Sequence, residues 1–233
     1  MKQNLILPLI TCTLLLMNAC KHVKDTSTSF DAAGWQEEKF DNEALSKWQL
    51  LGKGSVFTSA NGQTCLMESE NSQGVMILSP AYYKGDVVVK YKVLALSSAS
   101  VFVTILSATK TDASELNIPE DYDGSMGFWT NDVANYFIAF KNAPHGVTPY
   151  IAKNPVFTMA SVASEQDRML AGVYYDIEVG KLGTKVWLSV DGQKILDWED
   201  RAPAEGGHIA FRLRGTAGLK ASALIKDFVV YSK

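Results

Sequence analysis

The chain has 233 residues, with 22 basic and 25 acidic side chains and an apolar content of 47%. This composition is typical of a globular protein, and the absence of clustered Lys and Arg argues against a nucleic-acid-binding protein. A single β-rich domain can reach about 200–250 residues, so this length does not require two domains.

The N-terminus has the features of a lipoprotein signal peptide. After a short positively charged start, residues 5–17 are mostly apolar, and Ala19 directly precedes Cys20. This apolar run is too short for a membrane span, which needs about 20 residues. The Ala-Cys pair resembles a bacterial lipobox, whose cysteine is diacylated after cleavage, although Met17 stands where the lipobox usually has Leu. We therefore expect a signal peptide at 1–19 and lipidation of Cys20, and a plain secretory signal with an incidental cysteine is the alternative.

The remaining chain is expected to form a tether and one domain. Residues 20–34 are predicted to be a lipid-attached flexible tether, because 21–29 is polar and has no apolar period. Residues 35–233 show no composition shift and no internal repeat. Loose lipoboxes of this kind are similar to those of Gram-negative bacteria that degrade glycans. We therefore expect the protein in the cell envelope, on the periplasmic face or the cell surface, with the lipid anchor as its only membrane contact.

The cysteines leave no pair for an internal disulfide. Cys12 is removed with the signal peptide and Cys20 takes the lipid, so Cys65 has no partner. Cys65 lies within 63–67, which is typical of a strand, and we interpret it as a buried structural cysteine rather than a nucleophile. The fold must then be stabilised by core burial alone.

Short runs of alternating apolar and polar residues extend from Phe40 to the C-terminus, which is typical of a β-sandwich or barrel. Residues 86–94 place apolar side chains on one face only, whereas 100–106 is apolar on both faces, as in a central buried strand. Asp191-Gly192 is a favoured two-residue hairpin turn. Further strands are expected at 135–141, 173–179, 185–190, 194–198, 208–214 and 223–231, and short helical turns at 42–48 and 160–171.

Two parts of the sequence resemble known jelly-roll proteins. Residues 186–200 (VWLSVDGQKILDWED), the glycine-led 206–215 and the final 227–233 resemble the closing strands of concanavalin-like domains. Residues 127–155 (GFWTNDVANYFIAFKNAPHGVTPYIAKNP) are similar to the YesU-like proteins. These form an uncharacterised family of concanavalin A-like, glycan-associated proteins that occur beside enzymes of pectin and other glycan breakdown. The resemblance covers about 35–233 and implies an all-β fold, a concanavalin-like or galectin-like jelly-roll sandwich of two antiparallel sheets.

Residues 208–214 form the best candidate for a ligand-binding strand. Alternation places three apolar side chains on one face and His208, Arg212 and Arg214 on the other. Two arginines at a period of two present an array of forked donors suited to a carboxylate, a sulfate or vicinal hydroxyls. The alternative is a solvated face on which the arginines pair with nearby acids.

A second candidate region is the aromatic and polar segment 127–150. Aromatic rings offer apolar platforms to the C–H faces of sugars, and Asn and Lys donors can orient the hydroxyls. Alternation along 135–141 places Lys141 on the groove face and Tyr136 in the core, and the following loop places His145 at a rim, where a histidine without a role is the alternative. The candidate ligand-binding residues are Trp129, Asn131, Lys141, His145, Tyr150, His208, Arg212 and Arg214.

No complete catalytic motif is present. Retaining glycosidases of this fold class carry a Glu-x-Asp-x-x-Glu strand that brings two carboxyls to about 5–5.5 Å, and the sequence has no such strand. The acidic loop 120–124 is interpreted as a plain turn rather than a calcium site, because its spacing is not that of an EF-hand. Neither a zinc cluster nor a serine nucleophile motif is found, and no metal or cofactor is expected.

The sequence therefore predicts a carbohydrate-binding or carbohydrate-active accessory protein of a polysaccharide-utilisation system, with an oligo- or polysaccharide, acidic ones included, as its partner. One alternative is a polysaccharide lyase or another glycoside-cleaving enzyme, since elimination from a uronide needs a cation and a base. In that case His145 and the arginines should converge in a closed pocket. The other alternative is an envelope protein-interaction module without glycan binding, which should carry a large apolar patch.

Overall fold

The computed structural model describes residues 30–112, 116–141, 149–163, 169–216 and 218–233. The predicted signal peptide, the lipidation site Cys20 and most of the predicted tether lie outside the described residues, so they stay predictions. No helix within the described ranges combines the length and the apolar character that a membrane span requires.

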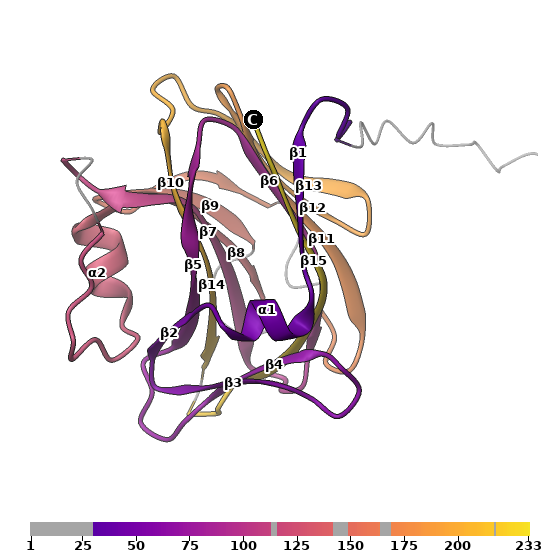
Figure 1. Cartoon of the computed structure of the whole chain (residues 1–233). Helices are drawn as coiled ribbons and strands as arrows, with labels where there is room; N and C mark the ends of the chain where they lie inside the picture. Colours follow the sequence, from indigo (N-terminus) through magenta and orange to yellow (C-terminus); the bar gives the residue numbers. More distant parts are fainter. Residues whose placement is uncertain (1–29, 113–115, 142–148, 164–168, 217) are drawn as a thin grey trace, which may run out of the picture.

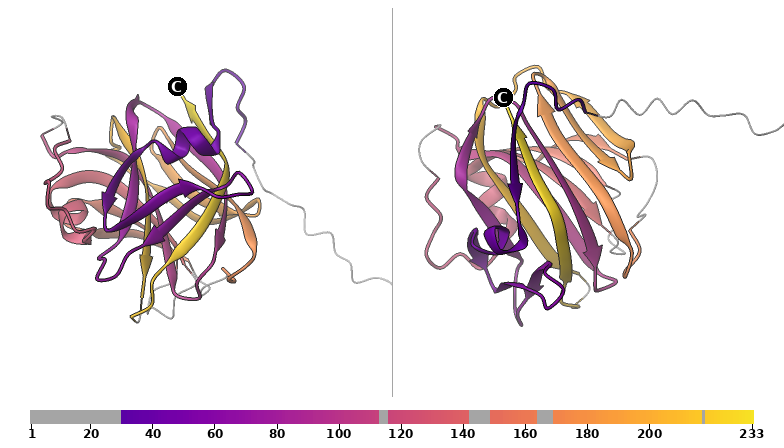
Figure 2. Two further views of the ribbon diagram at one scale, coloured as in Figure 1. Left: turned by 60° about the horizontal axis from the view of Figure 1, so that its bottom comes forward. Right: turned by 45° about the vertical axis from the view of Figure 1, so that its right-hand side comes forward.

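Two antiparallel sheets pack face to face, and the strands of each sheet come from distant parts of the chain (Figures 1 and 2). Sheet A has eight strands in the order β13-β12-β11-β6-β15-β4-β3, with β1 also paired to β15. Its strands are β1 (Gln36–Phe40), β3 (Gly54–Thr58), β4 (Thr64–Glu68), β6 (Val87–Ala95), β11 (Tyr174–Leu182), β12 (Lys185–Val190), β13 (Gln193–Glu199) and β15 (Ser222–Ser232).

Sheet B has seven strands in the order β10-β9-β8-β7-β14-β5-β2. Its strands are β2 (Gln49–Gly52), β5 (Val75–Lys84), β7 (Ser100–Lys110), β8 (Val133–Lys141), β9 (Tyr150–Asn154), β10 (Thr158–Val162) and β14 (Gly206–Gly215). This arrangement is the expected sandwich of two antiparallel sheets.

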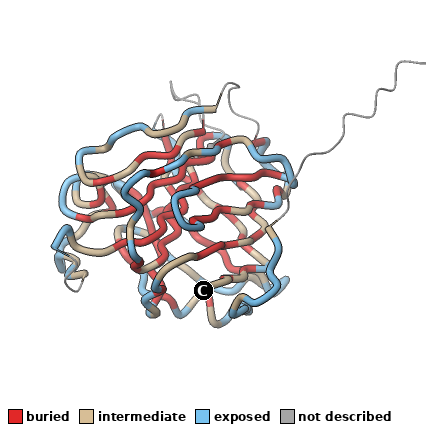
Figure 3. The backbone as a smooth tube through the Cα atoms, turned by 90° about the horizontal axis from the view of Figure 1, so that it is seen from above, coloured by how far each residue is buried: buried red, intermediate tan, exposed pale blue. Residues whose placement is uncertain are grey.

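The main core lies between the sheets and follows the alternation of the strands. On β6, the four side chains from Val87 to Val93 that share one face are all buried there. Each aliphatic side chain buried in this way contributes about 1.5–3 kcal/mol. Helix α1 (Asn42–Ser46) lies across one end of the gap and buries Leu45, and the Asp41 carboxylate caps it by accepting the Ala44 N–H at 2.7 Å (Figure 1). Buried residues consequently run along the strands, while exposed ones gather in the loops (Figure 3).

A second apolar layer covers part of the outer face of sheet B. Helix α2 (Met126–Asn131) lies outside this sheet (Figure 1). Its Trp129 packs with side chains of β7 and β8 such as Ile105 and Phe137, and residues 116–128 extend the cover. The covered part is buried, and the uncovered remainder of the same face carries the cavity described below.

Most of the strands expected from alternation are confirmed, as is the hairpin turn. Asp191 and Gly192 join β12 to β13 with positive φ angles of 50° and 77°, as a tight hairpin of this type requires. Cys65 on β4 is buried and unpaired, in agreement with a structural role. The expected helical turn at 160–171 is wrong where it is described, because Thr158–Val162 extends the sheet as β10. Pairing with β9 there outweighs the helix-favouring composition of the segment.

Candidate ligand-binding cavity on sheet B

A cavity of about 390 Å³ lies on the outer face of sheet B, beside the part that α2 covers. Its floor crosses five neighbouring strands, β14, β7, β8, β9 and β10. Neighbouring strands are about 4.8 Å apart, so the floor extends for roughly 19 Å across the sheet. The lining residues are Gln73, Val101, Val103, Ser125, Met126, Phe137, Tyr150, Phe157, Met159, Arg212, Arg214 and Thr216.

Arg212 forms the buried end of this cavity. It lies on β14 between Met76 of β5 and Val103 of β7, and only 2% of its surface is exposed. Its Nη2 donates to the backbone carbonyl oxygens of Gln73 at 2.6 Å and Gly124 at 2.9 Å. Its Nε is buried and has no hydrogen-bond partner. The guanidinium is thus fixed by the backbone and keeps unused donor capacity.

Three glycines allow the two carbonyl groups to reach Arg212. Gly74 has a φ of +136° and Gly124 a φ of +95°, a region that disfavours side chains. A Cβ on Gly124 would lie 1.8 Å from the Gly74 oxygen, and one on Gly52 would lie 2.2 Å from the same atom. The loops at 72–74 and 122–125 can therefore cross in direct backbone contact only because these positions are glycine.

Arg214 lies two residues further along β14, on the same face of the strand, and is half-buried. Its Nη1 donates to the carbonyl oxygen of Ser72 at 3.1 Å. Ser125 and Thr216 also line the cavity near this end, and the Thr216 hydroxyl donates to the Ala99 carbonyl oxygen at 3.3 Å. The end on β14 is therefore polar, and its two arginines give it a positive charge.

The opposite end of the cavity is aromatic. The rings of Phe137 and Tyr150 are stacked at a centroid distance of 6.2 Å, and Phe157 meets both of them edge-on at 6.2 and 5.8 Å. Met159 of β10 is exposed beside them. Burial raises the pKa of Tyr150 to about 12 although Arg212 opposes the rise, so its phenol stays protonated at neutral pH. This end combines apolar surface with one neutral hydroxyl.

A strained turn holds Phe157 in place. Val156 and Phe157 have φ angles of 78° and 49°, in the left-handed region that costs a residue with a side chain about 1–2 kcal/mol. The Val156 N–H donates to the Thr130 carbonyl oxygen at 2.8 Å, which ties the turn to α2. Strain of this kind collects at functional sites.

We expect Val156→Gly to stabilise the protein by about 1 kcal/mol. Glycine relieves the strain of the left-handed backbone, and the greater flexibility of glycine in the unfolded chain offsets part of this gain. The Val156 side chain is 82% exposed, so little packing is lost. Urea unfolding measures the change. Val162→Gly, in the ordinary extended backbone of β10, is the matched control and should lower the free energy of unfolding. If both variants lowered the free energy of unfolding, the backbone at Val156 would not be strained.

The structure brings three of the predicted ligand-binding residues together. Tyr150, Arg212 and Arg214 line the same cavity. The predicted faces of β14 and β8 are also confirmed, since Phe211 and Tyr136 are buried between the sheets. His208 is not part of the lining: its Nδ1 lies 3.0 Å from the Ser79 carbonyl oxygen, and its ring meets Tyr82 edge-on, four residues before Arg212 on the strand.

The expectation that Trp129 lines an open groove is wrong. Its side chain is 0% exposed beneath α2, and its Nε1 donates to the Tyr122 hydroxyl at 2.8 Å. Asn131 ends the same helix in an exposed position outside the cavity lining. Lys141 is the last residue of β8, but its side chain and the whole of His145 lie outside the described residues.

Nine of the twelve lining residues were not predicted, among them Phe137, Phe157, Met159 and Ser125. Phe137 lies on the face expected to line a groove, and alternation along β8 was a usable signal for it. Phe157, Met159 and Ser125 come from a turn, an edge strand and the residue preceding α2, and no local pattern marks them. Phe157 and Met159 reach Phe137 only through the pairing of β8, β9 and β10, and Ser125 reaches the cavity with α2.

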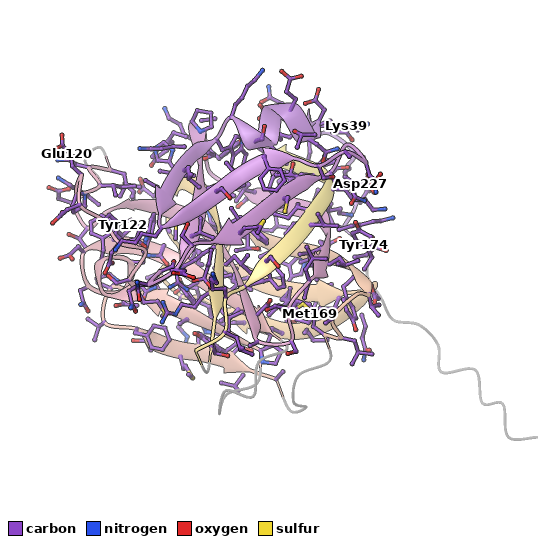
Figure 4. All side chains as sticks on the ribbon, turned by 90° about the horizontal axis from the view of Figure 1, so that it is seen from below. Lys39, Glu120, Tyr122, Met169, Tyr174 and Asp227 are labelled. Atoms are coloured by element: carbon purple, nitrogen blue, oxygen red, sulfur yellow. The ribbon has the colours of Figure 1, made fainter. Side chains whose placement is uncertain are left out.

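A smaller cavity of about 310 Å³ lies on the outer face of sheet A. Its charged lining residues balance, with three lysines and three acids. Lys90 pairs with Glu178 at 2.9 Å, and Lys92 lies 3.6 Å from Asp176 and 3.7 Å from Asp227. Figure 4 shows Asp227 on the flank opposite to Tyr122. The charges of this face are satisfied by one another.

The acidic loop 120–124 is part of the scaffold of the sheet B cavity. The Asp123 carboxylate accepts the Ser125 N–H at 2.9 Å, and this hydrogen bond holds its pKa below the usual value. Within the described residues, no group of three or more His, Cys, Asp or Glu side chains is arranged to hold a metal ion. Figure 4 shows Glu120 at the outer edge of this flank.

Comparison with known proteins places the fold. Neither a protein-family model nor a curated protein sequence matches the chain. Among solved structures, a Bacillus subtilis protein of unknown function with a galectin-like fold superposes with a TM-score of 0.72 at 16% identity, over 85% of this chain and 98% of that one. The chain is therefore a jelly-roll sandwich of the galectin-like and concanavalin-like kind, as the strand pattern and the resemblance predicted.

Other solved structures with this fold include a carbohydrate-binding module and a carrageenase. The carbohydrate-binding module CBM66 from Bacillus subtilis matches with a TM-score of 0.54 and 12% identity, over 79% of this chain and 94% of that one. The kappa-carrageenase from Pseudoalteromonas carrageenovora, in complex with an oligotetrasaccharide of kappa-carrageenan, matches with a TM-score of 0.56 and 10% identity, over 85% and 96%. At these identities the likeness establishes the fold alone.

Proposed function

We propose that this protein binds carbohydrate in the cavity on the outer face of sheet B. The observation that carries the proposal is the composition of that cavity, in which stacked aromatic rings and a methionine lie at one end and two arginines at the other. Sugars present apolar C–H faces and hydroxyl rims, and a mostly apolar pocket with a few placed polar groups suits both. The carbohydrate-binding module and the carrageenase that share the fold support this proposal.

The setting we propose is that of a lipid-anchored accessory protein of a polysaccharide-utilisation system in a Gram-negative cell envelope. It rests on the lipobox at Cys20 and on the resemblance of 127–155 to glycan-associated domains. Membrane extraction tests the anchor independently of any ligand. We expect the mature chain to stay with the membrane unless detergent is added, and Cys20→Ser to be released without detergent.

Binding is favoured over glycoside cleavage at this cavity. Its described lining contains neither Asp nor Glu, whereas glycoside hydrolysis by the usual route needs two carboxyls flanking the scissile bond. Tyr150 is the one titratable hydroxyl in the described lining, and its pKa of about 12 keeps the phenol protonated at neutral pH, so it has little capacity to accept a proton.

Isothermal calorimetry of the full chain against uronate, sulfated and neutral oligosaccharides tests the proposal. We expect at least one of them to bind, and Phe157→Ala to weaken that binding about tenfold, since stacking on one ring contributes about 1–1.5 kcal/mol. Phe57→Ala, at an exposed ring on β3 of the other sheet, is the matched control. A rise of absorbance near 235 nm on incubation would instead identify a lyase, and the absence of both heat and absorbance across the panel would refute carbohydrate binding.

A further inference from the structure

The sheet B cavity has an unbalanced positive charge. Its described lining contains two arginines and no acidic side chain, although the whole chain carries a net charge of −3. The cavity on sheet A, by contrast, has three lysines matched by three acids. A concave site lined by one sign of charge concentrates the field and attracts the opposite sign.

Neither Arg212 nor Arg214 forms an ion pair with a carboxylate of the described residues. Both donate to backbone carbonyl oxygens, and Arg212 also interacts with the Tyr122 hydroxyl. The nearby Glu68 acts on Arg212 through its charge without touching it, because its Oε2 accepts the N–H groups of Gly215 at 2.6 Å and Ala221 at 2.9 Å. The acid beside the cavity, Asp123, is likewise used by the Ser125 N–H.

An uncompensated buried guanidinium is costly. Burial lowers the pKa of Arg212 from its usual value, which reflects the penalty on the charged form. A buried charge is normally paired with an opposite charge. Here the backbone geometry, including three glycines, maintains the cation without one, and its Nε has no partner. The fold thus preserves a positive charge that no carboxylate of the described residues contacts directly.

We infer that the cavity selects sugars that carry an oxyanion, a carboxylate or a sulfate. This inference deepens the proposed carbohydrate binding and rests on it. The half-buried Arg214 contacts the oxyanion directly, and Arg212 beneath it supplies the field that makes an anion preferable to a hydroxyl. The sugar ring carrying the oxyanion lies over Val101 and Val103 of β7, and the neighbouring ring packs on Phe157 and Tyr150.

The order of the strands gives the ligand an orientation. Arg212 is on β14 and Tyr150 on β9, three strands away, which corresponds to about 14 Å across the sheet. The acidic group and the stacked ring therefore belong to different sugar residues. A single acidic monosaccharide can satisfy only one end and should bind more weakly than a di- or trisaccharide.

The test compares each acidic oligosaccharide with its own neutral counterpart by calorimetry on the full chain. Oligogalacturonates are carboxyl-reduced to galactose oligomers, and sulfated galactose oligosaccharides are desulfated, so chain length and linkage are kept. We expect neutralisation to weaken binding roughly 10- to 100-fold, as for the loss of a hydrogen bond to a charged group. The series that shows the loss identifies the carboxylate or the sulfate as the recognised group.

Arg214→Met is the decisive variant, because it removes the half-exposed cation and leaves the glycine junction intact. It should weaken the acidic ligand about tenfold or more and change the affinity for the neutral counterpart less than twofold. Arg201→Met, at an exposed arginine outside the cavity, is the matched control and should change neither.

The outcomes separate the two proposals. Equal binding of acidic and neutral counterparts, or selective binding of neutral sugars, would overturn the inference and leave carbohydrate binding in place. Selectivity that persists in Arg214→Met would place the anion elsewhere and also overturn the inference for this cavity. If no sugar binds, the proposed function fails, and the inference that rests on it fails too.

Discussion

Replacing Gly124 with alanine is expected to destabilise the protein by about 2–5 kcal/mol, the sum of left-handed backbone strain and overpacking. A Cβ at this position would lie 1.8 Å from the Gly74 carbonyl oxygen, and that contact is to backbone, which cannot rotate away. The loops at 72–74 and 122–125 would have to separate, and the Gly124 oxygen would move from Arg212. Ligand affinity should therefore fall together with the midpoint of urea unfolding.

Gly127→Ala is the matched control for this prediction. Gly127 lies three residues further on, in α2, where a Cβ would meet no atom within 4 Å. Alanine there should be neutral or stabilising by up to about 1 kcal/mol, because it favours the helix. Equal unfolding midpoints for the two alanine variants would contradict the backbone crossing at Gly124.

Replacing Trp129 with alanine is expected to cost about 3–5 kcal/mol, the range for large aromatic side chains in a core. The indole is completely buried between α2 and sheet B. Alanine would leave a cavity there and would remove the hydrogen bond from the indole N–H to the Tyr122 hydroxyl. Chemical unfolding measures the loss. Native-state hydrogen exchange should in addition show earlier opening of 126–131 than of the central strands.

Trp129→Phe separates a structural role from a ligand contact. It keeps a ring in the layer beneath α2 and removes the hydrogen bond, so we expect a smaller cost of about 1–2 kcal/mol. The affinity for oligosaccharides should be nearly unchanged in this variant. If Trp129→Phe had normal stability but no longer bound oligosaccharide, Trp129 would have to contact the ligand directly, which would contradict its burial.

Alternation predicted the strands that cross the core and the orientation of the cationic face. On β14 a period of two was sufficient to separate Phe211, in the core, from Arg212 and Arg214, in the cavity. The same reasoning placed His208 with the arginines, and here it was incomplete. The pairing of β14 with both neighbours shifts register between His208 and Ala210, so His208 packs against Tyr82 outside the cavity lining. Such a bulge depends on the neighbouring strands and leaves no mark in the sequence of β14 itself.

The position of Trp129 could not be predicted for a different reason. A run of one and a half turns has too few residues for a helical period, so 126–131 carried no helix signal, and an aromatic residue in a polar stretch favoured an exposed platform. Its burial depends on the cover that α2 forms over sheet B. The aromatic end of the cavity also depends on tertiary structure, because the strained turn before β10 brings Phe157 to Phe137.

The last two strands of the chain occupy interior positions in the two sheets. β14 lies between β7 and β5, and β15 lies between β6 and β4. Until residues 206–232 are available, each sheet consists of two separate halves, and the halves of the core cannot close on one another. Pairings between such distant segments make folding slow, because the entropy of closing long loops is lost before the contacts form. The closing of both sheets therefore depends on β14 and β15, the two strands that join the separate halves of each sheet.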